Sequence, residues 1–147
     1  MSPYGPRGFT LIEVLIVVVM VAILAAVVMP YALDRVGDSK QTTAIYNLAR
    51  LRALIYEYKV NHDRPLSGLL IELTVSTDKQ GNIGTGAAYP HGPYLLDIPL
   101  NPMSDSNVVT AIAVSPATAG NVTGTGGWLY NPSTAELWID HVDLIRE

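Results

Sequence analysis

The chain has 147 residues, a formal net charge of −4 and no cysteine. This length is too short for two large domains, and the mild acidity without a basic stripe argues against nucleic-acid binding. The absence of cysteine excludes disulfide bonds as a means of stabilising a small domain.

The first predicted element is an apolar run over residues 9–29, in which Glu13 is the only formal charge. About 20 apolar residues cross the hydrocarbon core as a helix, and lipid favours a helix because a lone strand would leave its backbone groups unpaired. The Leu, Ile, Phe and Val residues contribute roughly −4 to −8 kcal/mol to insertion, whereas a central carboxylate costs about 2.5 to 3.5 kcal/mol. The run therefore predicts a transmembrane helix, and its single acid marks a candidate functional site.

The flanks of the apolar run predict its orientation. Arg7 precedes the run and no acidic residue does, so the N-terminal end is expected in the cytoplasm and the chain after Pro30 outside the membrane. Two other interpretations stay open. One is a cleavable secretory signal, although Pro30-Tyr31-Ala32 is a poor cleavage site and the run is long for a signal core. The other is a plain single-pass anchor with an incidental acid.

The next predicted element is an amphipathic continuation of the helix over residues 30–62. Residues 31–60 alone would extend roughly 45 Å as a helix, and Asn61-His62-Asp63-Arg64-Pro65 supplies a stop. The apolar stripe is expected to pack on the head. It consists of residues at three- and four-residue steps: Ile45, Leu48, Leu51 or Arg52, Ile55 and Tyr58.

Residues 63–147 predict a small head with a thin core. Residues 66–73 are expected to form one or two helical turns, and residues 74–89 a loop that contains several glycines. Pro99 and Pro102 keep the following stretch extended and irregular.

The last third of the chain predicts three strands. They are residues 108–114, 128–130 and 136–141, which are separated by turn-forming sequences. The predicted fold class is therefore α+β, with a long N-terminal helix, half transmembrane and half amphipathic, packed on a small C-terminal antiparallel β-sheet.

The sequence predicts no enzyme. His62, His91 and His141 are widely scattered and lack paired metal-ligand spacing. No cysteine and no Gly-x-Ser-x-Gly nucleophile motif is present. The glycines of residues 81–86 are not followed by Gly-Lys-Ser/Thr, which favours turns over a phosphate-binding loop.

The N-terminal segment Gly8-Phe9-Thr10-Leu11-Ile12-Glu13, followed by the long apolar run and Pro30, resembles the processing motif of the type IV pilin superfamily. This superfamily includes the pseudopilins of type II secretion. The resemblance implies that residues 1–8 are a leader, that a prepilin peptidase cuts between Gly8 and Phe9, and that Phe9 becomes the methylated terminus. It further implies that Glu13 neutralises the terminal amine of a neighbouring subunit, a role that fits the need of a buried carboxylate for an opposite charge. Pro30 would mark a bend or melted stretch.

Two later segments are also similar to pseudopilins. One is Gly-Pro-Tyr-Leu from Gly92, with Ile-Pro and Asn-Pro after it, and the other is Gly-Trp-Leu-Tyr-Asn-Pro-Ser-Thr from Gly127. Together with the lack of cysteine, they favour a type II secretion pseudopilin over a surface pilin for adhesion, motility or DNA uptake. A single-pass membrane protein with a periplasmic binding head, a different class, stays open.

The resemblance implies a set of partners and a location. The partners would be further copies of the chain, related pseudopilins, the prepilin peptidase, an inner-membrane assembly platform and membrane lipid. The chain would be a single-pass protein of the inner membrane with a periplasmic head, and would assemble into a periplasmic or surface filament.

Calcium is the one cofactor that the resemblance raises, because major pseudopilins bind it in their C-terminal region. The candidate ligands are Asp97, Asp105, Asp140 and Asp143, with Asp105 beside Asn101 and Asn107 as the first choice. Calcium needs 6 to 8 oxygen ligands, and the sequence has no matching aspartate-rich loop. A solvated turn is therefore favoured over a calcium site.

Overall fold

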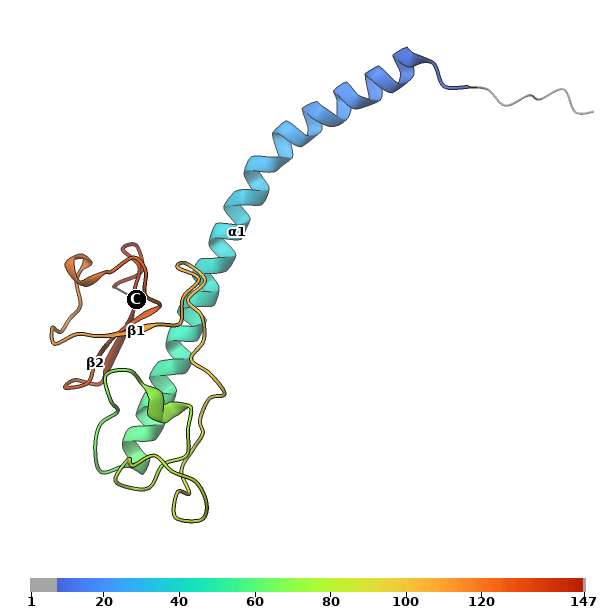
Figure 1. Cartoon of the computed structure of the whole chain (residues 1–147). Coiled ribbons are helices and arrows are strands. Elements are labelled where there is room, and N and C mark those ends of the chain that lie inside the picture. The colour runs from blue at the N-terminus through green and yellow to red at the C-terminus, as the bar shows by residue number, and fades with distance from the viewer. Residues whose placement is uncertain (1–7, 147) are drawn as a thin grey trace, which may run out of the picture. The chain divides into compact units, whose positions relative to one another are not determined.

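The computed structural model describes residues 8–146, and for Pro30 and residues 32–34 it describes the backbone alone (Figure 1). The chain divides into two compact units, Met1–Ser39 and Lys40–Glu147. One helix, α1 (Leu11–Asn61), contributes to both units. The structure therefore has the predicted long N-terminal helix, which begins at Leu11 rather than at Phe9.

The first unit contains the apolar part of α1. Residues Leu11–Met29 have a mean hydropathy of 3.2 and none of them is buried. By length and composition this segment can cross a membrane, as the sequence predicts. Pro30 lies inside α1, and the bend that the resemblance implies there stays a prediction.

The second unit begins with the amphipathic part of α1. The stripe that faces the head keeps the expected helical period, but it begins one residue earlier than predicted. Ala44 is fully buried, whereas Ile45 is 38% exposed and Arg52 also faces solvent. Neighbouring residues are separated by about 100° around a helix, so only one of Ala44 and Ile45 can face the core. The buried stripe of α1 consists of Ala44, Leu48, Leu51, Ile55 and Tyr58, and His62, which directly follows the helix, is also buried.

The sheet of the head has three strands in the order β1 (Val109–Ala111), β2 (Trp128–Asn131) and β3 (Glu136–Ile139). Strands β2 and β3 pair antiparallel, with Trp128 opposite Ile139. The prediction of a wholly antiparallel sheet is wrong at β1, which pairs parallel with β2. The reason is the long connection of residues 112–127, which returns the chain to the end from which β1 started.

The rest of the head consists of loops with short helical turns. The turns are η1 (Ile71–Leu73) and η2 (Ala119–Asn121). The predicted loop of residues 74–89 is present, and isolated bridges from Thr77 to Ile83 and to His91 hold it together. The core lies between the buried stripe of α1 and the sheet, with Trp128, Tyr130 and Ile139 as its main strand contributions.

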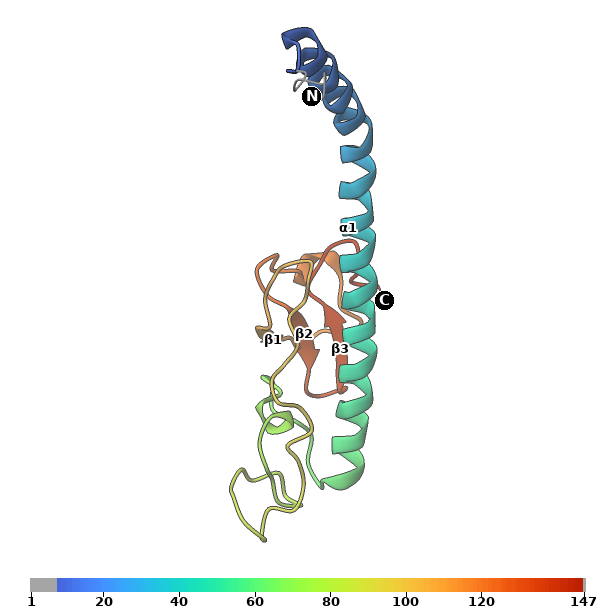
Figure 2. The same ribbon diagram turned by 90° about the vertical axis from the view of Figure 1, so that its right-hand side faces the viewer.

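The sheet and α1 are joined by a polar contact as well as by the core. Figure 2 shows β3 beside α1. The Arg52 guanidinium donates two hydrogen bonds to the Leu137 carbonyl oxygen, from Nε at 3.1 Å and from Nη2 at 2.9 Å. Arg52 therefore links α1 to one carbonyl group of the outer strand β3.

Candidate assembly site

The residues that the sequence singles out for processing and assembly lie at the start of α1. Gly8, Phe9 and Thr10 precede the helix, and Glu13 lies in its first turn. Glu13 Oε2 accepts hydrogen bonds from the Thr10 backbone N–H at 2.8 Å and from the Thr10 hydroxyl at 2.8 Å. The Glu13 N–H in turn donates to Thr10 Oγ1 at 3.3 Å. This reciprocal pattern is a capping box, with Thr10 as N-cap and Glu13 at the third helical position.

The capping box fixes Glu13 for a physical reason. The first N–H groups of a helix have no partner within the helix, and the positive end of the helix dipole favours a carboxylate in the first turn. Both bonds use Oε2, so neither involves Oε1. The capping role of Thr10 was not predicted from the sequence, although Thr-x-x-Glu before an apolar run is a signal for it.

The surface around the capping box is apolar. An open hollow of about 530 Å³ is lined by Phe9, Thr10, Leu11, Val14, Leu15 and Val18. Phe9 is 89% exposed. Phe9 and Val14 occupy the two positions of a hydrophobic staple, which fixes how the chain enters a helix. The start of α1 therefore presents one acid in an apolar surface.

The structure does not bring all predicted assembly residues together. Thr10 and Glu13 are in contact, and Phe9 is next to them in the chain. Pro30 is 17 positions after Glu13, roughly 25 Å along a straight helix, and its side chain lies outside the described part. Of the predicted leader, only Gly8 is described.

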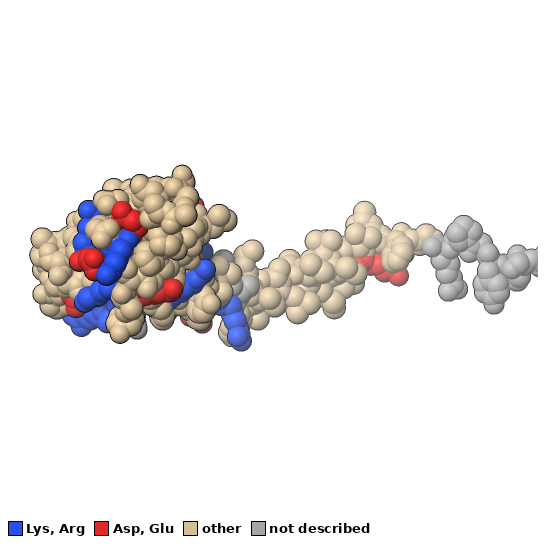
Figure 3. All heavy atoms as spheres, turned by 90° about the horizontal axis from the view of Figure 1, so that it is seen from below, with Lys and Arg blue, Asp and Glu red and all other residues tan. Residues whose placement is uncertain are grey.

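Figure 3 shows how different the two units are in surface chemistry. On the face that it draws, positively and negatively charged side chains are scattered over the head, whereas the apolar helical segment is almost entirely uncharged. Mixed charges are typical of a surface that contacts water, and an uncharged apolar surface is typical of one that contacts lipid or another protein.

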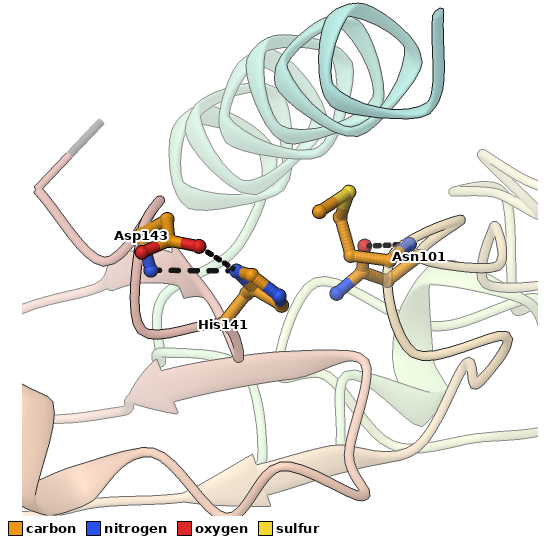
Figure 4. Close-up of polar contacts among 4 residues, drawn as sticks. Asn101, His141 and Asp143 are labelled. Atoms are coloured by element: carbon orange, nitrogen blue, oxygen red, sulfur yellow. Dashed lines mark hydrogen bonds and ion pairs between the residues drawn. The ribbon is translucent and has the colours of Figure 1, made fainter. Parts of the chain in front are cut away.

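The four calcium candidates make other contacts, and Asp140 accepts hydrogen bonds from Thr123 and Gly126. The Asp97 carboxylate accepts the N–H of Ile98 at 2.8 Å. The side chain of Asp105 is 81% exposed, and its Oδ2 lies 3.8 Å from Lys40 Nζ. Asp143 Oδ2 lies 3.8 Å from Nδ1 of His141, which also accepts the Asp143 N–H (Figure 4).

The amide of Asn101, proposed as a neighbour of the first calcium candidate, is also used internally. Its Oδ1 accepts the N–H of Met103 at 3.0 Å (Figure 4), and its Nδ2 donates to the Gly127 carbonyl at 3.1 Å. Among residues 8–146, no group of three or more His, Cys, Asp or Glu side chains could hold a metal ion. The residues present therefore do not fit a calcium site.

Glu136 and Tyr130 are among the groups of the head whose pKa values are shifted. Hydrogen bonds from the Ser115 hydroxyl and from Thr134 lower the pKa of Glu136 below its ordinary value. Burial, with a smaller effect from the Glu72 carboxylate, raises the pKa of Tyr130 to about 12. Neither group lies in the assembly site, but both report on the packing of the sheet.

Comparison with known proteins adds to this geometry. Residues 5–29 match the family model described as the prokaryotic N-terminal methylation motif. The chain is 26% identical over 107 residues to the type II secretion system core protein G of Pectobacterium carotovorum subsp. carotovorum, covering 69% of this chain and 64% of the relative. It is 40% identical over 55 residues to the core protein G of Pseudomonas aeruginosa, covering 37% of this chain and 39% of the relative.

A pilin is also among the similar proteins. The fimbrial protein of Neisseria meningitidis serogroup A is 36% identical over 76 residues, covering 51% of this chain and 45% of the relative. The matches thus span less than two thirds of the length of each of these three relatives. No solved structure matches the chain significantly.

Proposed function

We propose that the chain is a pseudopilin of the type IV pilin superfamily, a structural and non-enzymatic subunit of a type II secretion filament; the methylation motif and the similarity to core protein G support this. The observation that carries the proposal is the exposed apolar segment with one acid in its first turn, five residues after Gly8. A helix that is apolar on all sides has no water-facing side. Its surface must therefore contact lipid or other copies of the same helix.

The proposed cycle starts in the inner membrane. The chain spans it once, with the N-terminal end in the cytoplasm and the head in the periplasm. A prepilin peptidase removes residues 1–8 by cutting after Gly8, and Phe9 becomes the methylated terminus. The remaining parts are residues 9–29 as the transmembrane and filament-core helix, residues 30–62 as its amphipathic continuation, and residues 63–147 as the head.

Cleavage creates a positive charge that can pair with the Glu13 carboxylate. The Glu13 carboxylate is held at the helix start by Thr10, and a carboxylate in apolar surroundings is costly unless an opposite charge approaches it. The new amine of Phe9 on a neighbouring subunit supplies that charge. Because the apolar surfaces are buried in lipid before assembly and against other helices afterwards, the ion pair sets the register between subunits.

The same cycle defines the proposed partners. They are copies of the chain, related pseudopilins, the prepilin peptidase, an inner-membrane assembly platform and membrane lipid. Pro30, at the end of the apolar run, is the place where the helix would bend to fit the filament.

A second candidate is a type IV pilin of a surface pilus. The similarity to the fimbrial protein of Neisseria meningitidis favours it, and the matches to core protein G favour the pseudopilin. Both candidates use the same processing and assembly site. They differ in whether the fibre leaves the cell, which immuno-electron microscopy of intact cells distinguishes.

Mass spectrometry of the mature N-terminus tests the proposal. The expected terminus is a methylated Phe9. An intact Met1 would indicate a single-pass protein with a binding head, and a cut near Ala32 would indicate a secretory signal. Either of these results would exclude a filament subunit of this superfamily.

A further inference from the structure

A single buried carboxylate ties the loop before β2 to the end of β3. Asp140 follows β3 directly and is 0% exposed. Its Oδ1 accepts the N–H of Thr123 at 2.7 Å, and its Oδ2 accepts the N–H of Gly126 at 3.0 Å and the hydroxyl of Thr123. The Asp140 N–H also donates to the Gly127 carbonyl at 3.2 Å. Thr123, Gly126 and Asp140 are called the Asp140 clamp below.

The clamp is packed so closely that position 126 requires glycine. A Cβ atom at Gly126 would overlap Asp140 Oδ2. Only glycine therefore lets the backbone N–H come within hydrogen-bonding distance of the carboxylate. Hydrogen bonds to an ionised acceptor are about twice as strong as those between neutral groups, so the clamp is a strong link between two segments far apart in sequence.

Donors from the protein take three of the roughly four lone-pair sites of this carboxylate, which disfavours a metal ion there. All three groups that point at its oxygens are donors, with positively polarised hydrogen atoms on the side where a cation would bind. Calcium also needs 6 to 8 oxygen ligands. The donors from Thr123 and Gly126 occupy that space with N–H and O–H groups.

We infer that the Asp140 clamp closes the C-terminal loop of the head in place of a metal ion, so that the head keeps its fold and stability without calcium. The other acidic residues of this region agree, because Asp105 faces the Lys40 ammonium and Asp143 faces His141. The inference concerns the folding of the head. It holds whether or not the chain is a filament subunit.

Thermal unfolding of the full chain in detergent tests the inference. Trp128 and Trp138 are both buried in the sheet, so their fluorescence reports on the head. The melting temperature is expected to agree within about 1 °C between about 5 mM calcium and excess EGTA. A site occupied at 100 times its dissociation constant would raise it by roughly 10 °C. A calcium-dependent rise of more than about 3 °C would overturn the inference.

Variants test the clamp itself. Asp140→Asn keeps the shape of the side chain but loses its charge, and its amide group opposes the donors of the loop. We expect a fall in melting temperature of roughly 10 °C, because buried donors lose their acceptor. Asp143→Asn is the matched control, since this carboxylate is 73% exposed and only three residues away; its melting temperature should stay within about 2 °C.

A clamp variant that does not fold leaves the calcium comparison on the unmodified chain intact. If Asp140→Asn melts like the unmodified chain, the clamp does not close the loop and the inference is wrong.

Discussion

The two halves of α1 are the same secondary structure with opposite relations to their own chain. Residues 11–29 bury nothing, whereas residues 44–58 bury one continuous stripe that includes Leu48 and Leu51. Most helix stability in water comes from packing an amphipathic face, which only the second half has. The helical structure of the first half is instead favoured by lipid or by other helices. In these apolar surroundings the backbone groups find hydrogen-bond partners only within the helix. Substitutions should therefore alter assembly in the first half and folding in the second.

The largest effect is expected from Glu13→Ala in the first half. The subunit should remain in the membrane, because removing a charge makes insertion easier, but it should fail to join filaments. The melting temperature of the head should not change. The measurements are filament yield by shearing and electron microscopy, and head stability by tryptophan fluorescence.

Glu13→Gln is the control, because it keeps the hydrogen-bonding shape without the charge. Normal filaments from either variant would show that the acid has no role in assembly. A change in head stability would contradict the separation between the two halves.

In the second half, Leu51→Ala should destabilise the head by about 2 to 5 kcal/mol, because it leaves a cavity in the core. Membrane insertion and processing after Gly8 should be unchanged. Urea unfolding measures the loss. Ala53→Ser, on the exposed side of the same turn, is the control and should cost less than about 0.5 kcal/mol.

The stability of the head at alkaline pH depends on the burial of Tyr130 in the same core as Leu51. Tyr130 has a pKa of about 12 in the folded chain against an ordinary value of 10, so the unfolded chain loses this proton first. The contribution of Tyr130 is fully present below pH 10 and is lost as the pH rises to about 12, at a cost on the order of 2 kcal/mol. Tyr130→Phe should reduce this decline. Equal slopes for the two proteins in urea unfolding between pH 9 and about 12 would contradict the assignment.

The smallest effect is expected from Thr10→Ala, which removes the N-cap and keeps the charge of Glu13. It should destabilise the start of α1 by about 0.5 to 2 kcal/mol and leave the head unchanged. Hydrogen exchange of the first helical turn in detergent measures this fraying. Thr10→Ser is the control, and it should exchange like the unmodified chain because serine caps equally well.

The sequence could predict those features that depend on local pattern. The apolar span, the helical period from Leu48 to Tyr58 and the acid in the first turn all follow from spacing along the chain. The choice between Ala44 and Ile45 does not. Both are three or four residues from Leu48, and packing placed the smaller, less hydrophobic residue inside.

Two other features depend on contacts far apart in sequence. The parallel pairing of β1 depends on the path of residues 112–127, which no local pattern reveals. The Asp140 clamp joins residues 14 and 17 positions apart, and an aspartate after a strand is most often a solvated turn residue. The N-cap role of Thr10 could have been predicted from the sequence, because its spacing to Glu13 is a known capping signal.

The contact between Arg52 and Leu137 affects how the outer strand β3 can pair with strands of neighbouring molecules. In the sheet order β1-β2-β3, the outer strands are β1, of three residues, and β3. An open outer strand recruits strands from other molecules and starts aggregation, a hazard that grows when many heads are held close together. Arg52 of α1 donates two hydrogen bonds to the Leu137 carbonyl on the outer strand β3. One carbonyl group of the β3 edge is therefore occupied within the chain and is not available to a strand of another molecule.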